Sequence, residues 1–133
     1  MKIRDMVHVK RIQSAAAPLE RWYNRLLDKE PEEMTASDIL RALRQRVFVE
    51  IAEEMLIRKL QDDAFAGDLM QGELMETLAE FSPESIAKFR DAVGAIVMTA
   101  ELNAEQYAWA CDDDKRDFLA SVGVVKSNLL HCT

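Results

Sequence analysis

The stretch TASDILRALRQRVFVEIAEEMLIRKL, Thr35 to Leu60, decides the fold class. Thr35 followed three residues later by Asp38 is typical of a capping box, in which each side chain accepts the other residue's free backbone N–H at a helix start. The apolar residues after it recur at the spacing of one helical face. They are Ile39, Leu40, Leu43, Val47, Phe48, Ile51, Ala52, Met55, Leu56 and Leu60. The stretch predicts two helices or one bent helix, because no Gly or Pro separates Leu43 from Val47.

Helical signals continue on both sides of this stretch. Upstream, residues 18–29 show an apolar face at helical spacing, and Pro18 suits a first turn, where a backbone N–H would be unpaired anyway. Downstream, residues 72–81 predict a short helix. Ser82, followed by a proline, is a typical N-cap, and the apolar spacing of the next helix continues to Ala100.

The C-terminal part predicts one further helix over residues 114–122. The acidic residues Asp112 to Asp114 stand at its positive end, and Gly123 lies just beyond it, as a helix stop often does. The remaining tail, residues 124–133, carries no clear pattern, and the structure of residues 1–17 is not predicted.

The whole chain has the composition of a helical globular protein. Its 133 residues suffice for one ordinary hydrophobic core, with 49% hydrophobic and 31% charged residues. Only four Gly and three Pro are present, which is little material for a sheet with many turns. We therefore expect an all-α fold, a single compact bundle of about five to six helices, with residues 1–133 as one domain.

The net charge of −7 and the sequence pI near 4.9 restrict the partners. Nucleic acids and anionic membranes attract proteins with excess Lys and Arg, so we expect neither and instead expect a basic partner. No apolar run approaches the roughly 20 residues that span a bilayer, and the start, MKIRDMVHVKR, lacks a secretory pattern. Cys111 and Cys132 are too few for a disulfide framework. These features predict a cytoplasmic protein.

No motif predicts catalysis or a bound cofactor. The only histidines, His8 and His131, stand near the two ends, and no Cys-x-x-Cys, His-Glu-x-x-His or glycine-rich phosphate loop is present. We therefore expect no enzyme, no cofactor, and no catalytic or metal-binding residue.

The stretch DDAFAGDLMQGE, residues 62–73, partly fits the calcium loop of an EF-hand. Asp62 would be its first residue, Gly67 its sixth and Glu73 its twelfth. The third and fifth positions hold alanine, whose methyl group cannot coordinate calcium. Calcium binding is kept only as an alternative, as is acid–base catalysis by the paired carboxylates.

Several short motifs follow one another between Arg25 and Leu78. A Met-Thr-x-x-Asp helix start leads through an Arg-Gln element and an apolar helix to an Asp-x-Phe-x-Gly loop and a Gly-Glu-Leu closure. The residues are Met34, Thr35, Asp38, Arg44, Gln45, Asp63, Phe65, Gly67, Gly72, Glu73 and Leu74. In this order the motifs resemble the soluble immunity proteins of bacterial contact-dependent growth inhibition (CDI) systems.

The resemblance implies a protein that binds the toxin domain delivered by a neighbouring cell and blocks it without catalysis. It also implies that residues 62–73 form a turn between helices, in which Phe65 packs inward and Glu73 begins the next helix. Most soluble toxins of this kind are nucleases with basic surfaces for phosphate, and an acidic inhibitor is complementary to such a surface. We expect stoichiometric inhibition of a basic nuclease domain.

Acidic residues are the expected docking surface for this toxin domain. Glu76 and Glu80 lie one turn apart, outside the apolar stripe of their helix. Trp109, close before three aspartates, offers an aromatic anchor. The expected toxin-binding residues are Asp62, Asp63, Glu76, Glu80, Trp109, Asp112, Asp113 and Asp114.

A helical adaptor or regulatory subunit is the alternative function. Seven methionines and the absence of a catalytic motif suit a protein that binds a partner helix or a basic protein.

Overall fold

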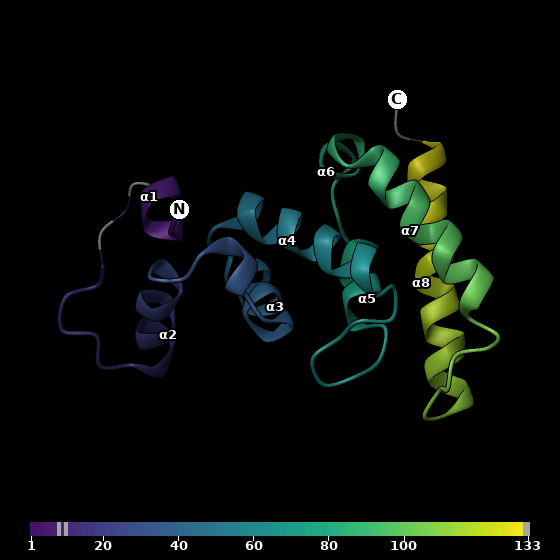
Figure 1. Cartoon of the computed structure of the whole chain (residues 1–133), viewed down its shortest axis with the longest axis horizontal. Coiled ribbons are helices and arrows are strands. Elements are labelled where there is room, and N and C mark those ends of the chain that lie inside the picture. The colour runs from purple at the N-terminus through teal and green to yellow at the C-terminus, as the bar shows by residue number, and fades with distance from the viewer. Residues whose placement is uncertain (8, 10, 132–133) are drawn as a thin grey trace. The chain divides into compact units, whose positions relative to one another are not determined.

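The computed structural model describes residues 1–7, 9 and 11–131, and every regular element in them is helical (Figure 1). This confirms the all-α prediction. The elements are α1 (Ile3–Val7), α2 (Pro18–Leu27), η1 (Pro31–Glu33), α3 (Ala36–Gln45), α4 (Val49–Asp62), α5 (Glu73–Leu78), α6 (Pro83–Lys88), α7 (Arg90–Asn103) and α8 (Asp112–Leu130). The described α-helices outnumber the five to six expected because no prediction covered α1 and because the single helix expected from Ser82 to Ala100 forms as α6 and α7.

The described residues form two units, 1–55 and 56–133, and the boundary between them falls inside α4. The single domain expected from the chain length stays a prediction. Within the described part of the chain, no helix combines the length and the apolar character that crossing a membrane requires.

A buried carboxylate joins α2 to α3 in the first unit. The predicted capping box is present, because Thr35 Oγ1 accepts from the Asp38 backbone N–H and Asp38 accepts from that of Thr35. Asp38 also accepts from Trp22 Nε1 at 3.0 Å and from Lys29 Nζ at 2.6 Å. Burial alone would raise the pKa of Asp38, but these donors outweigh burial and lower it. The carboxylate therefore stays ionised inside the unit.

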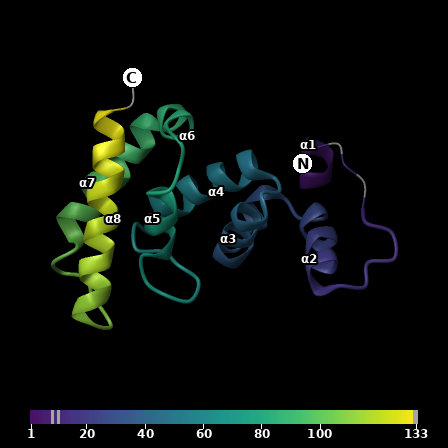
Figure 2. The same cartoon turned by 180° about the vertical axis from the view of Figure 1, so that it is seen from behind.

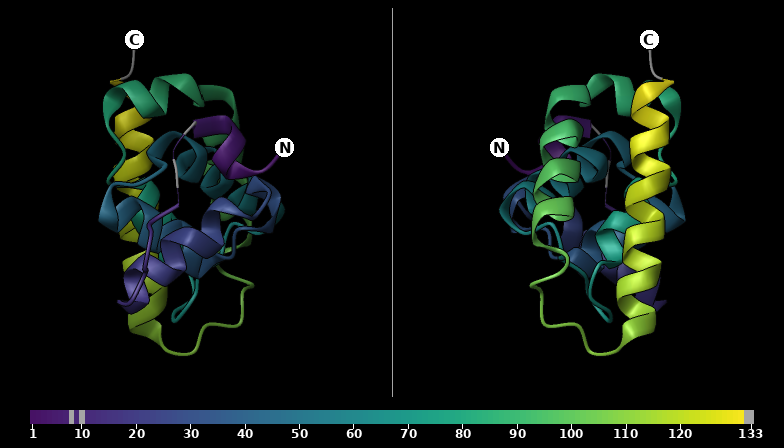
Figure 3. Two further views of the ribbon diagram at one scale, coloured as in Figure 1. Left: turned by 90° about the vertical axis from the view of Figure 1, so that its left-hand side faces the viewer. Right: turned by 90° about the vertical axis from the view of Figure 1, so that its right-hand side faces the viewer.

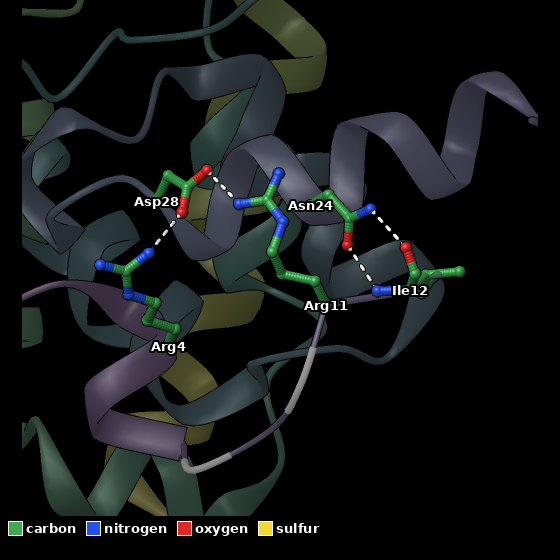
Figure 4. Close-up of polar contacts among 5 residues, drawn as sticks. All are labelled: Arg4, Arg11, Ile12, Asn24 and Asp28. Carbon is green, nitrogen blue, oxygen red and sulfur yellow. Dashed lines mark hydrogen bonds and ion pairs between the residues drawn. The ribbon is translucent and has the colours of Figure 1, made fainter. Parts of the chain in front are cut away.

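The N-terminal segment is fastened to α2 by side chains (Figure 4). Arg4 and Arg11 each donate to one carboxylate oxygen of Asp28, and the bond from Arg11 is the main cause that lowers the pKa of Asp28. Asn24 accepts from the Ile12 N–H at 2.8 Å and donates to the Ile12 carbonyl at 3.0 Å. Arg4, Arg11 and Ile12, whose structure the sequence does not predict, are thus held against α2 by tertiary contacts.

The stretch that decides the fold forms two helices. Arg46 and Phe48 both have positive φ values, 59° and 50°, which end α3 and start α4 without any glycine. The Phe48 ring stacks on Tyr23 of α2 with the centroids 5.2 Å apart. The turn between α3 and α4 is thus accompanied by ring stacking, and the residue types Arg and Phe do not predict this turn.

In the second unit, α7 and α8 run antiparallel and contact each other, and α5 packs against α8 (Figures 2 and 3). Ser82 caps α6 as predicted, by accepting from the Ser85 N–H. The helix expected from Ser82 to Ala100 is interrupted at Phe89, between α6 and α7. The predicted end at Gly123 is wrong, because α8 continues to Leu130 and buries Val125 beyond the glycine.

Candidate functional site

The loop between α4 and α5 is closed by backbone hydrogen bonds. The N–H of Gly72 donates to the carbonyl of Phe65 at 2.9 Å, and that of Leu74 to the carbonyl of Ala66 at 3.1 Å. The Glu73 carboxylate accepts from the N–H groups of Asp68 and Leu69, at 2.8 and 3.0 Å. As expected, Phe65 is buried and Glu73 is the first residue of α5. The loop is therefore a turn between two helices that is closed by its own hydrogen bonds.

Two glycines make this tight loop sterically possible. A Cβ on Gly67 would lie 1.8 Å from the carbonyl oxygen of Met70. Gly72 has φ +79°, a left-handed conformation, and a Cβ there would lie 2.6 Å from Cδ1 of Phe118. Gly67, the glycine that fits the EF-hand pattern, is thus required here by close packing.

Four aromatic rings pack beneath the loop. Phe65 stacks on Tyr107 with the ring centroids 4.0 Å apart, and it meets Trp109 edge-on at 5.5 Å. Phe118 of α8 contacts both Phe65 and Trp109. Tyr107 and Trp109 are partly exposed, whereas the other two rings are buried. The residues after α7 form a turn rather than helix, which lets Tyr107 and Trp109 contact the same ring.

Gln71 ties this loop to the turn before α8. Its Nε2 donates to the Tyr107 hydroxyl at 3.1 Å and to the Ala108 carbonyl at 3.4 Å, while its Oε1 accepts from the Ala110 N–H at 3.2 Å. One amide side chain therefore holds two segments more than 30 residues apart side by side. We call residues 67–72 and 107–110, with this amide between them, the paired loops.

Carboxylates from α5, from the residues just after it and from α8 gather around Glu76. Partial burial of Glu76 is the largest cause that raises its pKa, and the charge of Asp117 is the next. Glu73, Asp114 and Glu80 raise that pKa further. Among the described residues, no ion pair neutralises Glu76, Asp114 or Asp117. We call Glu76, Glu80, Asp114 and Asp117 the carboxylate cluster.

The other expected docking residues occupy separate positions. Asp62 ends α4 and is exposed, and Asp63 is exposed but uses Oδ1 to accept from the Phe65 N–H. Asp112 begins α8, where Asp113 pairs with Arg116 at 2.7 Å. Trp109 donates its indole N–H to the Ala104 carbonyl. The structure thus brings Glu76, Glu80 and Asp114 together and places Trp109 in the aromatic packing.

The net charge is confined to one unit. Residues 1–55 contain ten basic and ten acidic residues, whereas residues 56–133 contain seven basic and fourteen acidic ones. The whole net charge of −7 therefore belongs to the second unit, which holds both the carboxylate cluster and the paired loops.

Sequence reasoning missed three contributors to this region. Asp117 stands four residues beyond Asp113 on α8, and only the packing of α8 on α5 places it near Glu76. Leu69 and Met70 look like core residues by type, yet both are exposed. The flanking glycines Gly67 and Gly72 are the one signal that could have indicated a tight loop with its tip outside the core.

The last residue of the EF-hand-like stretch is engaged in other contacts. Glu73, which would be the bidentate ligand, accepts two backbone N–H groups of its own loop. Over residues 1–7, 9 and 11–131, no group of three or more His, Cys, Asp or Glu side chains could hold a metal ion.

Comparison with known protein families matches residues 5–96 to the model of the CDI immunity proteins. The matched segment includes the whole loop between α4 and α5 and most of the described helices up to the middle of α7. No curated protein matches the chain.

Proposed function

The chain belongs to the CDI immunity proteins, and we propose that it neutralises its cognate toxin by stoichiometric binding, without catalysis, in the cytoplasm. We further propose that this toxin is a basic nuclease domain. Binding of an acidic inhibitor to a surface that otherwise holds phosphate requires no chemical step, and long-range attraction accelerates the encounter.

The carboxylate cluster is the observation that supports this proposal. Burial and four neighbouring carboxylates oppose ionisation of Glu76, so the fold keeps an arrangement that is locally unfavourable. A basic partner would relieve this repulsion, because each cation placed near the cluster favours the charged form of Glu76. The confinement of the net charge to residues 56–133 supports the same assignment.

The test uses an inactivated form of the cognate toxin domain. We expect Glu76→Lys/Glu80→Lys to lower the association rate constant by at least about tenfold at low salt, and we expect rising salt to slow the native protein. Stopped-flow fluorescence measures both effects.

The matched control is Glu50→Lys/Glu84→Lys, which changes the total charge equally at two exposed residues outside the cluster. We expect it to retain most of the native rate. Equal rates for both variants, with no dependence on salt, would show that the toxin docks elsewhere.

A further inference from the structure

We propose that the paired loops carry the centre of the toxin contact, a platform formed by Leu69, Met70, Tyr107 and Trp109 that receives an apolar projection on an otherwise basic protein surface. This inference rests on the proposed function and names the part of the second unit that contributes most to affinity.

The platform presents apolar surface that the fold itself leaves uncovered. Leu69 is 87% exposed and Met70 is 49% exposed, although both are large apolar side chains. Tyr107 and Trp109 stand partly exposed on the neighbouring loop, which Gln71 holds next to Met70. Met, Tyr and Trp are enriched at the centres of protein interfaces, and Tyr and Trp recur among the residues that dominate affinity.

Hydrogen bonds and ring stacking restrain the two loops of the platform in the absence of a partner. Backbone bonds close the first loop, the Glu73 carboxylate holds the N–H groups at its tip, and Gln71 makes three hydrogen bonds to the second loop. Stacking of Phe65 on Tyr107 supports the platform from below. Because little conformational freedom remains to be lost, a contact here retains more of its binding free energy.

The charge around the platform selects a basic protein as the occupant. Residues 61–73 and 103–114 contain no Lys or Arg, and their acidic residues are Asp62, Asp63, Asp68, Glu73, Glu105, Asp112, Asp113 and Asp114. The next two basic residues along the chain, Lys115 and Arg116, pair with Glu105 and Asp113. Such a rim repels nucleic acid and anionic lipid and complements a basic protein.

The exposed apolar pair on α7 provides a matched control. Met98 and Leu102 are 64% and 72% exposed and lie one turn apart, so they match the loop pair in residue type and exposure. Acidic residues are sparse there, because α7 holds only Asp91 and Glu101, and Glu101 pairs with Lys126.

The experiment compares Leu69→Ser/Met70→Ser with Met98→Ser/Leu102→Ser. Each is titrated by calorimetry against the same inactivated toxin domain. We expect the loop variant to raise Kd by at least about tenfold, which corresponds to a loss of roughly 1.4 kcal/mol of binding free energy. The α7 variant should raise Kd by less than about threefold. Equal Kd values for the loop variant and the native protein, or a larger loss in the α7 variant, would overturn the platform.

Hydrogen exchange on the native complex provides a readout that needs no variant. We expect the toxin to slow amide exchange at residues 66–72 and 105–111 and to leave α7 unchanged. If the toxin slows amide exchange only in other segments, the proposed platform is contradicted, even where the native protein binds the toxin and protects cells. If the native protein itself fails to bind, the proposed function fails first, so the two failures are distinguishable.

Discussion

At the scale of single residues, two carboxylates show how the surroundings set the ionisation of an acid. Asp38 is buried, yet Lys29, the Thr35 N–H and Trp22 keep its pKa low. Glu76 is partly buried and lies among other acids, and both burial and these neighbouring charges raise its pKa. The first contributes stability when ionised, whereas ionisation of the second opposes folding.

We expect Glu76→Gln to raise the melting temperature at pH 7 by about 1–3 °C, because it removes the repelled charge and keeps the side-chain shape. A raised folded pKa means that the penalty is present at neutral pH and fades as pH falls through that pKa toward the unfolded value, near 4.3. The gain should therefore vanish below about pH 4. Thermal melts across this pH range measure it.

The control is Glu84→Gln, which removes an equal charge from an exposed residue of α6 outside the cluster. It should not raise the melting temperature. A similar gain in both variants would mean that only the net charge matters, and not the neighbours of Glu76.

The sequence predicted local contacts of both carboxylates. The capping box paired Thr35 with Asp38, and spacing put Glu80 near Glu76, although α5 ends at Leu78 rather than at Phe81 as expected. Spacing within one helix carries no information about Trp22 or Asp117, since these approach from other helices. Tertiary contacts of this kind cannot be derived from a local pattern.

At the scale of elements, glycine has opposite roles in two places. Gly72 adopts a left-handed conformation in contact with Phe118, whereas Gly123 lies exposed in the middle of α8 with no atom near its missing Cβ. The same residue type predicted a helix end at Gly123, which is wrong, because packing of Val122 and Val125 holds α8 together there.

We expect Gly72→Ala to lower the free energy of unfolding by roughly 2–4 kcal/mol, through backbone strain and the clash with Phe118. Gly123→Ala should raise it by about 0.5–1 kcal/mol, because alanine is the better helix former. Urea denaturation monitored by circular dichroism measures both. Stabilisation by Gly72→Ala would contradict the described loop.

Helix boundaries were the least predictable part of the elements. Thr35 and Ser82 mark real helix starts because their hydroxyls accept backbone N–H groups within the same turn. The turn at Arg46 and Phe48 uses residue types that rarely take positive φ, so no local preference indicates it. Stacking of Phe48 on Tyr23 is a contact between separate helices, which periodicity cannot reveal.

At the scale of the whole molecule, the charge is divided between the two units. Composition alone predicted an acidic protein with a basic partner, but it gives no division of that charge along the chain. Counting within units 1–55 and 56–133 assigns all of it to the second. Both the carboxylate cluster and the platform belong to this acidic unit, which is the one that a basic toxin, as proposed, would attract most strongly.

The seven methionines are also divided, and this exposes the platform to oxidation. Met34, Met55 and Met75 are buried, whereas Met1, Met6, Met70 and Met98 are exposed. A mild peroxide should convert the exposed group to sulfoxides first, which makes the Met70 side chain polar. We expect the oxidised protein to bind the toxin domain several-fold more weakly, and Met70→Leu, unlike Met98→Leu, to prevent that loss. Immunity would then depend on the cell's capacity to reduce methionine sulfoxide.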